Sequence, residues 1–224
     1  MLAFYLTSLM GVALLVISYR YASAADTAPQ WFKAFPVPAW GDFFVYAGLM
    51  ATSALGILTF VMQLMLIPSA SMEPGLMTGS KILVKPAAFG AVNPFTGSHI
   101  TDGNFSDLKR GDVVIAKFAY NADVRYIKRV VALPGDTIAV NTTGITLNGE
   151  FLAFEPTGES MIYRVTLGEH EYRVMIDPDK DFLEQPKVTV PANQVFMLGD
   201  NLTKSSDSRD LGFIPMHNII ARPY

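Results

Sequence analysis

Two polar side chains of this sequence are of the types that together cleave amides. Ser71 stands in the segment 68–72, PSASM, and Lys128 stands in the segment 126–131, YIKRVV. A serine hydroxyl attacks an amide carbonyl when a nearby base accepts its proton and when hydrogen-bond donors stabilise the oxyanion that forms. A neutral lysine amine can be that base, so the two residues form a candidate nucleophile and base.

A histidine held by a carboxylate is the commoner base, but the sequence does not indicate one. His99 lies in a loop-like stretch, His170 in a charged Glu-His-Glu segment and His217 near the C-terminus. The chain has no cysteine and no His-x-x-x-His pair, which leaves a metal site unsupported. We therefore expect neither a metal nor another cofactor.

Lys128 can accept a proton near neutral pH only if its pKa falls well below the ordinary value of about 10.4. Burial lowers the pKa because it disfavours the charged ammonium. In an extended strand Tyr126, Lys128 and Val130 share one face, so the amine emerges between an aromatic and a β-branched residue. Arg129 then points to the other face. The alternative is that Lys128 extends to water, as most lysines do.

A third polar segment follows near the C-terminal end. Residues 196–201, FMLGDN, indicate a strand that ends in a tight turn, and residues 205–212, SSDSRDLG, follow it. Such a loop can present a serine that orients a lysine amine, with an Asp–Arg pair that stiffens the turn. The alternative is an ordinary solvent-exposed loop.

The elements that must position these side chains begin with apolar stretches. Residues 43–67 are 25 residues without a charge, enough to cross a hydrocarbon core of roughly 30 Å as a helix. Residues 2–19 are also uncharged and end at Arg20. We expect a first transmembrane helix over 1–20, a loop over 21–42, a second transmembrane helix over 43–67 and an exported catalytic domain over 68–224.

The basic residues of the N-terminal region orient these spans. Arg20 and Lys33 are the only lysines or arginines of the first 67 residues, and both lie between the spans. The positive-inside rule places that loop in the cytoplasm and the domain over 68–224 outside. The alternative is a cleavable leader that ends at residues 22–24, ASA, but no basic residue precedes its apolar run.

The sequence after residue 68 predicts a mainly β domain. Asn148-Gly149 between apolar residues predicts a two-residue hairpin turn. We expect a long loop over 87–107 and another over 153–170. A net charge of −3 without a block of like charge indicates no nucleic-acid partner. Short β-branched runs bounded by glycine and proline favour a barrel or an orthogonal sandwich, with strands over 81–85, 112–118, 125–133, 172–176, 187–190 and 195–198.

In their order and residue types, the three polar segments resemble those of bacterial type I signal peptidases, which are membrane-bound serine–lysine proteases. The resemblance rests on Ser71-Met72, on the segment 126–136, YIKRVVALPGD, and on the GDN and SxDSR residues of 199–209. It implies a mainly β, signal-peptidase/repressor-autoprotease-like fold with an inserted β subdomain, which we expect over 137–194.

The resemblance also implies a function. A member of this family removes N-terminal signal peptides from exported preproteins after small residues of the Ala-x-Ala type. The two spans resemble the arrangement of the Gram-negative members, in which the protein lies in the inner membrane with its catalytic domain on the periplasmic side. The implied partners are preproteins that carry signal peptides and the lipid bilayer.

Carried over to matching positions, the resemblance implies Ser71 as the nucleophile and Lys128 as the general base. Ser69 matches the hydroxyl that supports the oxyanion beside the Ser71 amide, and Ser205 matches the serine that hydrogen-bonds the lysine amine. Asp207 and Arg209 match a structural ion pair near the site, and Arg129 adjoins that pair. The residues that match the lining of small pockets, which accept the side chains ahead of the cut bond, are Ile67, Leu76, Tyr126 and Ile127.

The chain departs from the family pattern at three positions without replacing a proposed catalytic group. Leu202 stands where an arginine is usual, Ser80 stands where an aspartate is frequent, and Glu73 stands beside Met72. Relatives often continue through another strand after the segment that ends here at Tyr224, which indicates a compact or a shortened version.

Two rival functions stay open. A specialised relative that matures one conjugative pilin or one secreted partner has the same chemistry. A catalytically inactive, membrane-anchored β module that binds a partner has the same fold. Self-cleaving repressors share the serine–lysine pair, but they need a DNA-binding domain and no spans, so we exclude them.

Overall fold

The structure is a computed structural model that describes residues 47–48, 50–54, 56, 62–86, 88–90, 103–118 and 121–224. It separates into two units, Met1–Val61 and Met62–Tyr224. In the first unit the described residues are helical. None of the helices within these described ranges is long and apolar enough to cross a membrane. The predicted span over 1–20 and the loop over 21–42 lie outside the described residues, as does most of the span over 43–67.

The C-terminal end of the predicted span over 43–67 is a strand rather than a helix. Gln63–Leu66 forms β1, which pairs antiparallel with β2 (Lys81–Lys85). Exposure alternates along β1, and Met65 packs against buried apolar residues. The prediction of a helix up to residue 67 is therefore wrong at this end, because apolar composition does not show that a partner strand lies further along the chain.

Seven antiparallel strands form the main sheet. Besides β1 and β2 these are β3 (Val113–Phe118), β4 (Asn121–Ala132), β12 (Gln194–Leu198), β13 (Ile214–Pro215) and β14 (Ile219–Pro223). Their spatial order is β1-β2-β14-β3-β4-β12-β13, which places β4 in the interior of the sheet. The strands predicted over 81–85, 112–118, 125–133 and 195–198 all lie in this sheet, with ends that differ by a few residues.

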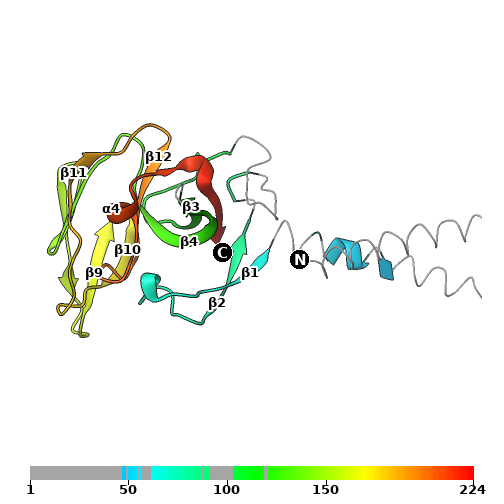
Figure 1. The fold of residues 1–224 in the computed structure, drawn as a ribbon, viewed down its shortest axis with the longest axis horizontal. Coiled ribbons are helices and arrows are strands. Elements are labelled where there is room, and N and C mark those ends of the chain that lie inside the picture. The colour runs from blue at the N-terminus through cyan, green and yellow to red at the C-terminus, as the bar shows by residue number, and fades with distance from the viewer. Residues whose placement is uncertain are drawn as a thin grey trace, which may run out of the picture. The chain divides into compact units, whose positions relative to one another are not determined.

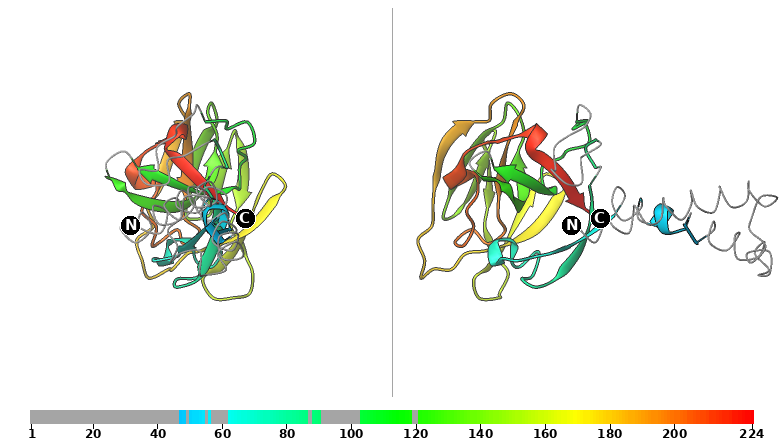
Figure 2. Two further views of the ribbon diagram at one scale, coloured as in Figure 1. Left: turned by 90° about the vertical axis from the view of Figure 1, so that its right-hand side faces the viewer. Right: turned by 45° about the vertical axis from the view of Figure 1, so that its right-hand side comes forward.

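Between β4 and β12 the chain builds two smaller sheets. Their strands are β5 (Thr137–Asn141), β6 (Gly144–Leu147), β7 (Glu150–Ala153), β8 (Glu155–Pro156), β9 (Ile162–Leu167), β10 (His170–Met175) and β11 (Gln185–Thr189). One sheet has the order β11-β5-β6-β7 and the other the order β10-β9-β8. Figures 1 and 2 show both sheets on the same side of β3 and β4.

The predicted loop over 153–170 contains β8 and β9, so this prediction is wrong. Within β9 the side chains of Ile162, Val165 and Leu167 are buried, whereas Arg164 is exposed. The polar residues of this stretch occupy the solvent side of a strand. Gly158 and Gly168 stand on either side of β9, and Val165, Thr166 and Leu167 between them show the alternation of a strand.

The predicted hairpin at Asn148-Gly149 is confirmed. β6 and β7 pair antiparallel with Leu147 opposite Glu150, so these two residues form the whole connection. Asn148 has φ 53° and Gly149 has φ 88°, the positive values that a two-residue hairpin of the primed type requires. Local sequence alone therefore determined this turn.

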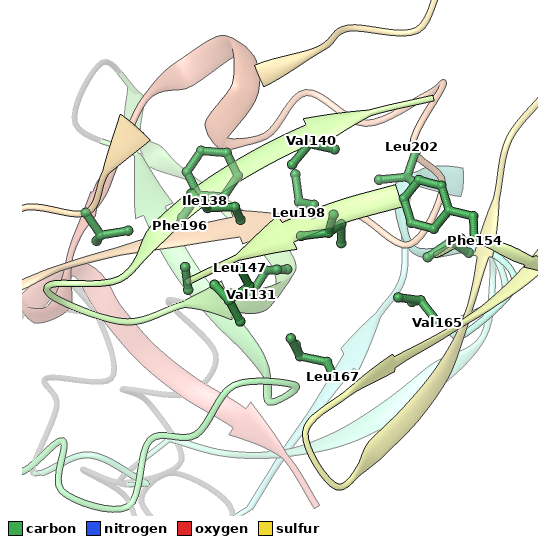
Figure 3. Close-up of a cluster of buried hydrophobic side chains, with 14 residues drawn as sticks. Val131, Ile138, Val140, Leu147, Phe154, Val165, Leu167, Phe196, Leu198 and Leu202 are labelled. Atoms are coloured by element: carbon green, nitrogen blue, oxygen red, sulfur yellow. The ribbon is translucent and has the colours of Figure 1, made fainter. Parts of the chain in front are cut away.

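The buried apolar side chains show that the inserted sheets share a core with the main sheet. Val131 of β4 and Phe196 of β12 pack in one cluster with residues of β5, β6 and β9 (Figure 3). Neighbouring residues of the same strands, Val130 and Met197, belong to a second cluster, so both faces of the main sheet are covered. The mainly β prediction is confirmed, and the insertion is part of the single unit Met62–Tyr224.

Candidate active site

Ser71 lies in η2 (Ala70–Met72), a short helical turn between β1 and β2. The residue before this turn, Ser69, has an extended backbone, with φ −137° and ψ 157°. Met72 is buried in an apolar cluster, and its carbonyl accepts a hydrogen bond from the Leu76 amide at 2.7 Å. A buried side chain and a backbone hydrogen bond thus hold the turn that presents Ser71.

The third polar segment lies directly against the backbone of Ser71. The Asn201 amide donates a hydrogen bond to the Ser71 carbonyl oxygen at 3.1 Å. Gly199 has no space for a side chain, since a Cβ there would lie against the Ser71 carbonyl and the Ser205 hydroxyl. The tight turn after β12 is therefore packed onto Ser71, and the alternative of a solvent loop is excluded for this turn.

Lys128 reaches Ser71 from β4. Its Nζ donates a hydrogen bond to the Ser71 Oγ at 2.9 Å, and the residue is only 2% exposed. In the main sheet Lys128 is paired with Val114 of β3, and β12 flanks β4 on the other side. The alternative in which this lysine extends into water is excluded.

The surroundings of Lys128 favour its neutral form. Burial lowers the pKa of the amine from 10.5 to about 8, although the carboxylates of Asp207 and Asp200 act in the opposite direction. The guanidinium of Arg209 lowers the pKa further. A pKa of about 8 leaves roughly one tenth of the amine neutral at pH 7, which is enough for a general base.

Two further hydroxyls stand beside this pair. Ser69 Oγ lies 3.3 Å from Ser71 Oγ. Ser205 Oγ is buried and, among the residues that the structure describes, has no hydrogen-bond partner. The bond from Ser205 to the Lys128 amine that the resemblance implies is therefore not formed here. A buried hydroxyl without a partner is rare and calls for a functional explanation.

Asp207 and Arg209 form a completely buried ion pair. Two guanidinium nitrogens of Arg209 donate to the two carboxylate oxygens of Asp207, each at 2.9 Å. Asp207 also accepts from the Gly199 amide at 3.0 Å and caps α4 (Ser208–Leu211). Arg209 in turn donates to the Leu202 carbonyl at 2.7 Å. The pair joins both ends of the loop that contacts Ser71.

Arg129 does not pair with Asp207 or Arg209 but has a carboxylate of its own. It donates to both oxygens of Asp200, at 2.8 and 2.7 Å, and to the Gly111 carbonyl at 2.7 Å. Burial raises the pKa of the Asp200 carboxyl above its ordinary value, against the effect of Arg129. Sequence reasoning assigned no role to Asp200. The signal was present, because an arginine on the buried side of an interior strand needs a carboxylate partner.

Three of the four predicted pocket residues lie together. Ile67, Leu76 and Ile127 belong to the same apolar cluster as Met72, which follows Ser71 in the chain. Tyr126 lies on the other face of β4 from Ile127, which is the face that carries Lys128. Its ring meets that of Phe118 edge-on at 4.8 Å, and Lys128 Nζ lies 6.0 Å from the centre of the Tyr126 ring. This division follows from the alternation of side chains along a strand. The role of these residues as a substrate pocket stays a prediction.

The three departures from the family pattern have defined contacts. Glu73 accepts hydrogen bonds from the amide and hydroxyl of Thr78, at 3.2 and 2.7 Å, and so closes the turn after Ser71. The Ser80 hydroxyl donates to the Met77 carbonyl at 2.6 Å. Leu202 is buried in the core that the inserted sheets share with the main sheet.

Within the described ranges, no group of three or more His, Asp or Glu side chains is placed to hold a metal ion.

Comparisons with known proteins show which family the chain is similar to. The family model described as "Signal peptidase, peptidase S26" matches residues 38–223. A signal peptidase I of Pseudomonas aeruginosa is 32% identical over 191 residues, and one of Pseudomonas fluorescens is 34% identical over 193 residues. Each alignment covers 74% of this chain and 64% of the relative, so the chain spans less than two thirds of their length. A solved signal peptidase I of Enterococcus faecalis aligns with a TM-score of 0.34 at 22% identity, over 51% of this chain and 94% of that one.

Proposed function

The chain belongs to the signal peptidase family, peptidase S26, and on this premise we propose that it is a membrane-bound serine endopeptidase that removes signal peptides from exported preproteins. The observation that carries the proposal is the contact between Lys128 and Ser71. A lysine amine that is 2% exposed and lies 2.9 Å from a serine hydroxyl is placed to take its proton.

The proposed reaction has two steps. Neutral Lys128 accepts the Ser71 proton while Ser71 Oγ attacks the scissile carbonyl carbon. The new lysine ammonium then gives its proton to the departing amine, and an acyl-enzyme remains. In the second step Lys128 takes a proton from water, the resulting hydroxide attacks the ester, and the proton returns to Ser71. No cofactor is needed.

We assign the oxyanion to two donors, the Ser69 hydroxyl and the Ser71 amide. The distance of 3.3 Å between the hydroxyls of Ser69 and Ser71 supports this assignment, since the oxyanion forms next to the attacking oxygen. We assign Ser205 as the group that orients the Lys128 amine. The support is its buried hydroxyl, which has no hydrogen-bond partner among the described residues and so is free to bond the amine.

The proposed specificity is for small residues ahead of the cut bond, of the Ala-x-Ala type. Ile67, Leu76 and Ile127 support it, because they present an apolar surface around the nucleophilic turn. Tyr126 is the fourth residue of this assignment, and the support for it is the distance of 6.0 Å between its ring centre and Lys128 Nζ. The preprotein and the bilayer are the proposed partners.

We place the enzyme in the inner membrane of a bacterium, with the catalytic domain on the periplasmic side. The uncharged stretches 2–19 and 43–62 support two spans, and Arg20 and Lys33 between them support this orientation. A nucleophile close in sequence to a span would act on a substrate whose own apolar segment is already held in the membrane, which raises its local concentration.

Processing of a preprotein by the purified full chain in detergent tests the proposal. Ser71→Ala should abolish cleavage and leave the fold intact, because the change removes only the attacking oxygen. Ser106→Ala, at an exposed loop residue, is the matched control and should cleave as the wild type does. Wild-type cleavage by Ser71→Ala would refute the assignment. A panel of preproteins separates a general peptidase from one dedicated to a pilin or to another single partner.

A further inference from the structure

The inserted three-stranded sheet contacts the backbone that holds the nucleophile. At the end of β10, the Met175 amide donates to the Asp200 carbonyl at 2.8 Å, and the Leu202 amide donates to the Met175 carbonyl at 2.9 Å. Between these two bonds lies Asn201, whose amide holds the Ser71 carbonyl. The strand β10 is therefore one hydrogen-bonded step away from Ser71.

The same strand also contacts the neighbour of the base. The ring of Tyr172 covers the guanidinium of Arg129, with 4.2 Å between the guanidinium carbon and the ring centre. Arg129 follows Lys128 in β4 and makes its two hydrogen bonds to Asp200, the residue that precedes Asn201. A chain of contacts thus runs from Tyr172 of the inserted sheet through Arg129 to Asp200. Arg129 adjoins Lys128 in the chain, and Asp200 adjoins Asn201, which bonds the Ser71 backbone.

We propose that Tyr172 is a positioning residue for the Ser71–Lys128 pair, acting through the Arg129–Asp200 ion pair that its ring shields from water. This inference rests on the proposed function and names a residue of the inserted sheet on which the reaction depends. Tyr172 does not act on the substrate. It affects how Arg129 and Asp200 are oriented and how far their charges neutralise each other next to Lys128.

The ring is suited to this role by its shape and its π face. Arg129 uses Nε, Nη1 and Nη2 for hydrogen bonds in the plane of the guanidinium, so the face of the group is what remains to be covered. An aromatic face attracts the cation and excludes water at the same time. Without it, water competes for the Asp200 carboxylate, and a buried ion pair that admits water is less well oriented.

The charge balance at Lys128 follows from the same contact. Asp200 favours the ammonium form of Lys128, and Arg129 neutralises Asp200 while the pair is intact. A loosened pair therefore raises the pKa of the amine and leaves less neutral base at a given pH. Asp200 acts on both Lys128 and Arg129. The other charged groups are Asp207 and Arg209, which act on Lys128, and Asp112, which acts on Arg129. None of these groups is changed in the experiment below.

The test compares three variants of the full chain in detergent. Tyr172→Leu should lower kcat on the order of tenfold at neutral pH, since a desolvated cation–π contact is lost. It should leave KM within about twofold and move the rising limb of the pH–rate profile upward by roughly half to one pH unit. Tyr172→Phe keeps the aromatic face and should retain most of the wild-type rate. If Tyr172→Leu does not fold, Tyr172→Met replaces it, because methionine fills more of the volume without a π face.

Tyr163→Leu is the matched control. Tyr163 lies on the neighbouring strand β9 and packs against the shared core. Its loss should lower the melting temperature without moving the pH–rate profile. The proposal is overturned if Tyr172→Leu keeps the wild-type kcat and profile, if Tyr172→Phe loses as much as Tyr172→Leu, or if Tyr163→Leu moves the profile equally.

A second readout separates this proposal from the proposed function. The pKa of the Lys128 amine, followed by NMR in selectively labelled protein, should be higher in Tyr172→Leu than in the wild type. This measurement needs no substrate. A wild type that cleaves no preprotein but shows this difference would contradict the proposed function and support the positioning role, whereas an unchanged pKa would overturn the positioning role.

Discussion

At the scale of single residues, the environment of Lys128 determines whether the proposed chemistry is possible. Sequence reasoning identified Ser71 and Lys128 from their types and from the segments around them. It left open whether the amine is buried, because the same strand pattern fits a lysine that extends into water. The contact of 2.9 Å and the burial of the amine are tertiary properties, since Ser71 and Lys128 lie far apart in the chain.

The pKa of Lys128 predicts the pH dependence of cleavage. The base works when neutral, so kcat should rise with pH through about 8 and level off above it. At pH 7 we expect roughly a tenth of the plateau rate. Initial rates on a preprotein between pH 6 and 9.5 measure this profile. A rate that stays constant over that range would mean that another group accepts the Ser71 proton.

Replacement of the lysine should make the protein inactive but more stable. The pKa of Lys128 is lower in the folded chain than the 10.5 of the exposed amine, so the unfolded chain binds more protons between about pH 8 and 10.5, and stability rises with pH there. Below pH 8 the buried ammonium costs the folded state roughly 3 kcal/mol. Lys128→Met removes this cost and should not cleave.

Thermal unfolding at two pH values measures this effect. The gain in melting temperature from Lys128→Met should be largest near pH 7 and should shrink towards pH 10.5, where the amine is neutral in the folded chain and half titrated in the unfolded chain. Lys117→Met, at a partly exposed lysine of the neighbouring strand β3, is the control. An equal gain at both pH values would show that apolar packing, rather than the buried charge, limits the stability of the wild type.

At the scale of elements, sequence reasoning succeeded where the local pattern decides the structure. The hairpin at Asn148-Gly149 and the strands β2, β3 and β12 have β-branched residues or turn residues that suffice to identify them. It failed for β1, whose apolar residues continue those of the predicted span, and for β9, whose polar side faces water. In both cases the partner strand decides the outcome, and the partner is not visible in the local sequence.

The turn after Ser71 is an element whose packing can be tested. A Cβ on Gly75 would lie against Asp200 Oδ2 and 3.3 Å from the Met72 carbonyl. Gly75→Ala should therefore displace either the Asp200 carboxylate or the turn that carries Ser71, and we expect kcat to fall about tenfold with a modest loss of stability.

Gly144→Ala is the matched control for this prediction, because its Cβ would lie against the Leu152 carbonyl in the β6–β7 hairpin. It should cost stability and leave kcat unchanged in the folded protein. Rates on a preprotein and melting temperatures distinguish the two effects. If Gly75→Ala has wild-type kcat, the contact between this turn and Asp200 has no role in the reaction.

At the scale of the whole molecule, the proposed membrane topology rests on the sequence. Apolar length and the positions of Arg20 and Lys33 support two spans and an exported domain. The unit Met62–Tyr224, named the catalytic unit below because it holds the proposed Ser71–Lys128 pair, fits such a domain, since the inserted sheets also belong to it.

Cysteine labelling tests this topology, because the chain has no cysteine of its own. In spheroplasts, Ser106→Cys in the catalytic unit should react with a membrane-impermeant maleimide. Ser23→Cys in the loop over 21–42 should react only after the membrane is permeabilised. Labelling of Ser23→Cys from outside would reverse the orientation, and labelling of neither variant before permeabilisation would place the catalytic unit in the cytoplasm.

The sequence by itself determined most of the strands and indicated the chemistry that we propose, because the types and order of Ser71, Lys128 and the 199–209 segment are local features. Tertiary structure alone decided which groups are dry and which are paired. It buried Lys128, gave Arg129 the carboxylate of Asp200 and placed Tyr172 over that arginine. Desolvation and ion pairing depend on residues that approach one another only when distant strands pack, and no local pattern specifies which they will be.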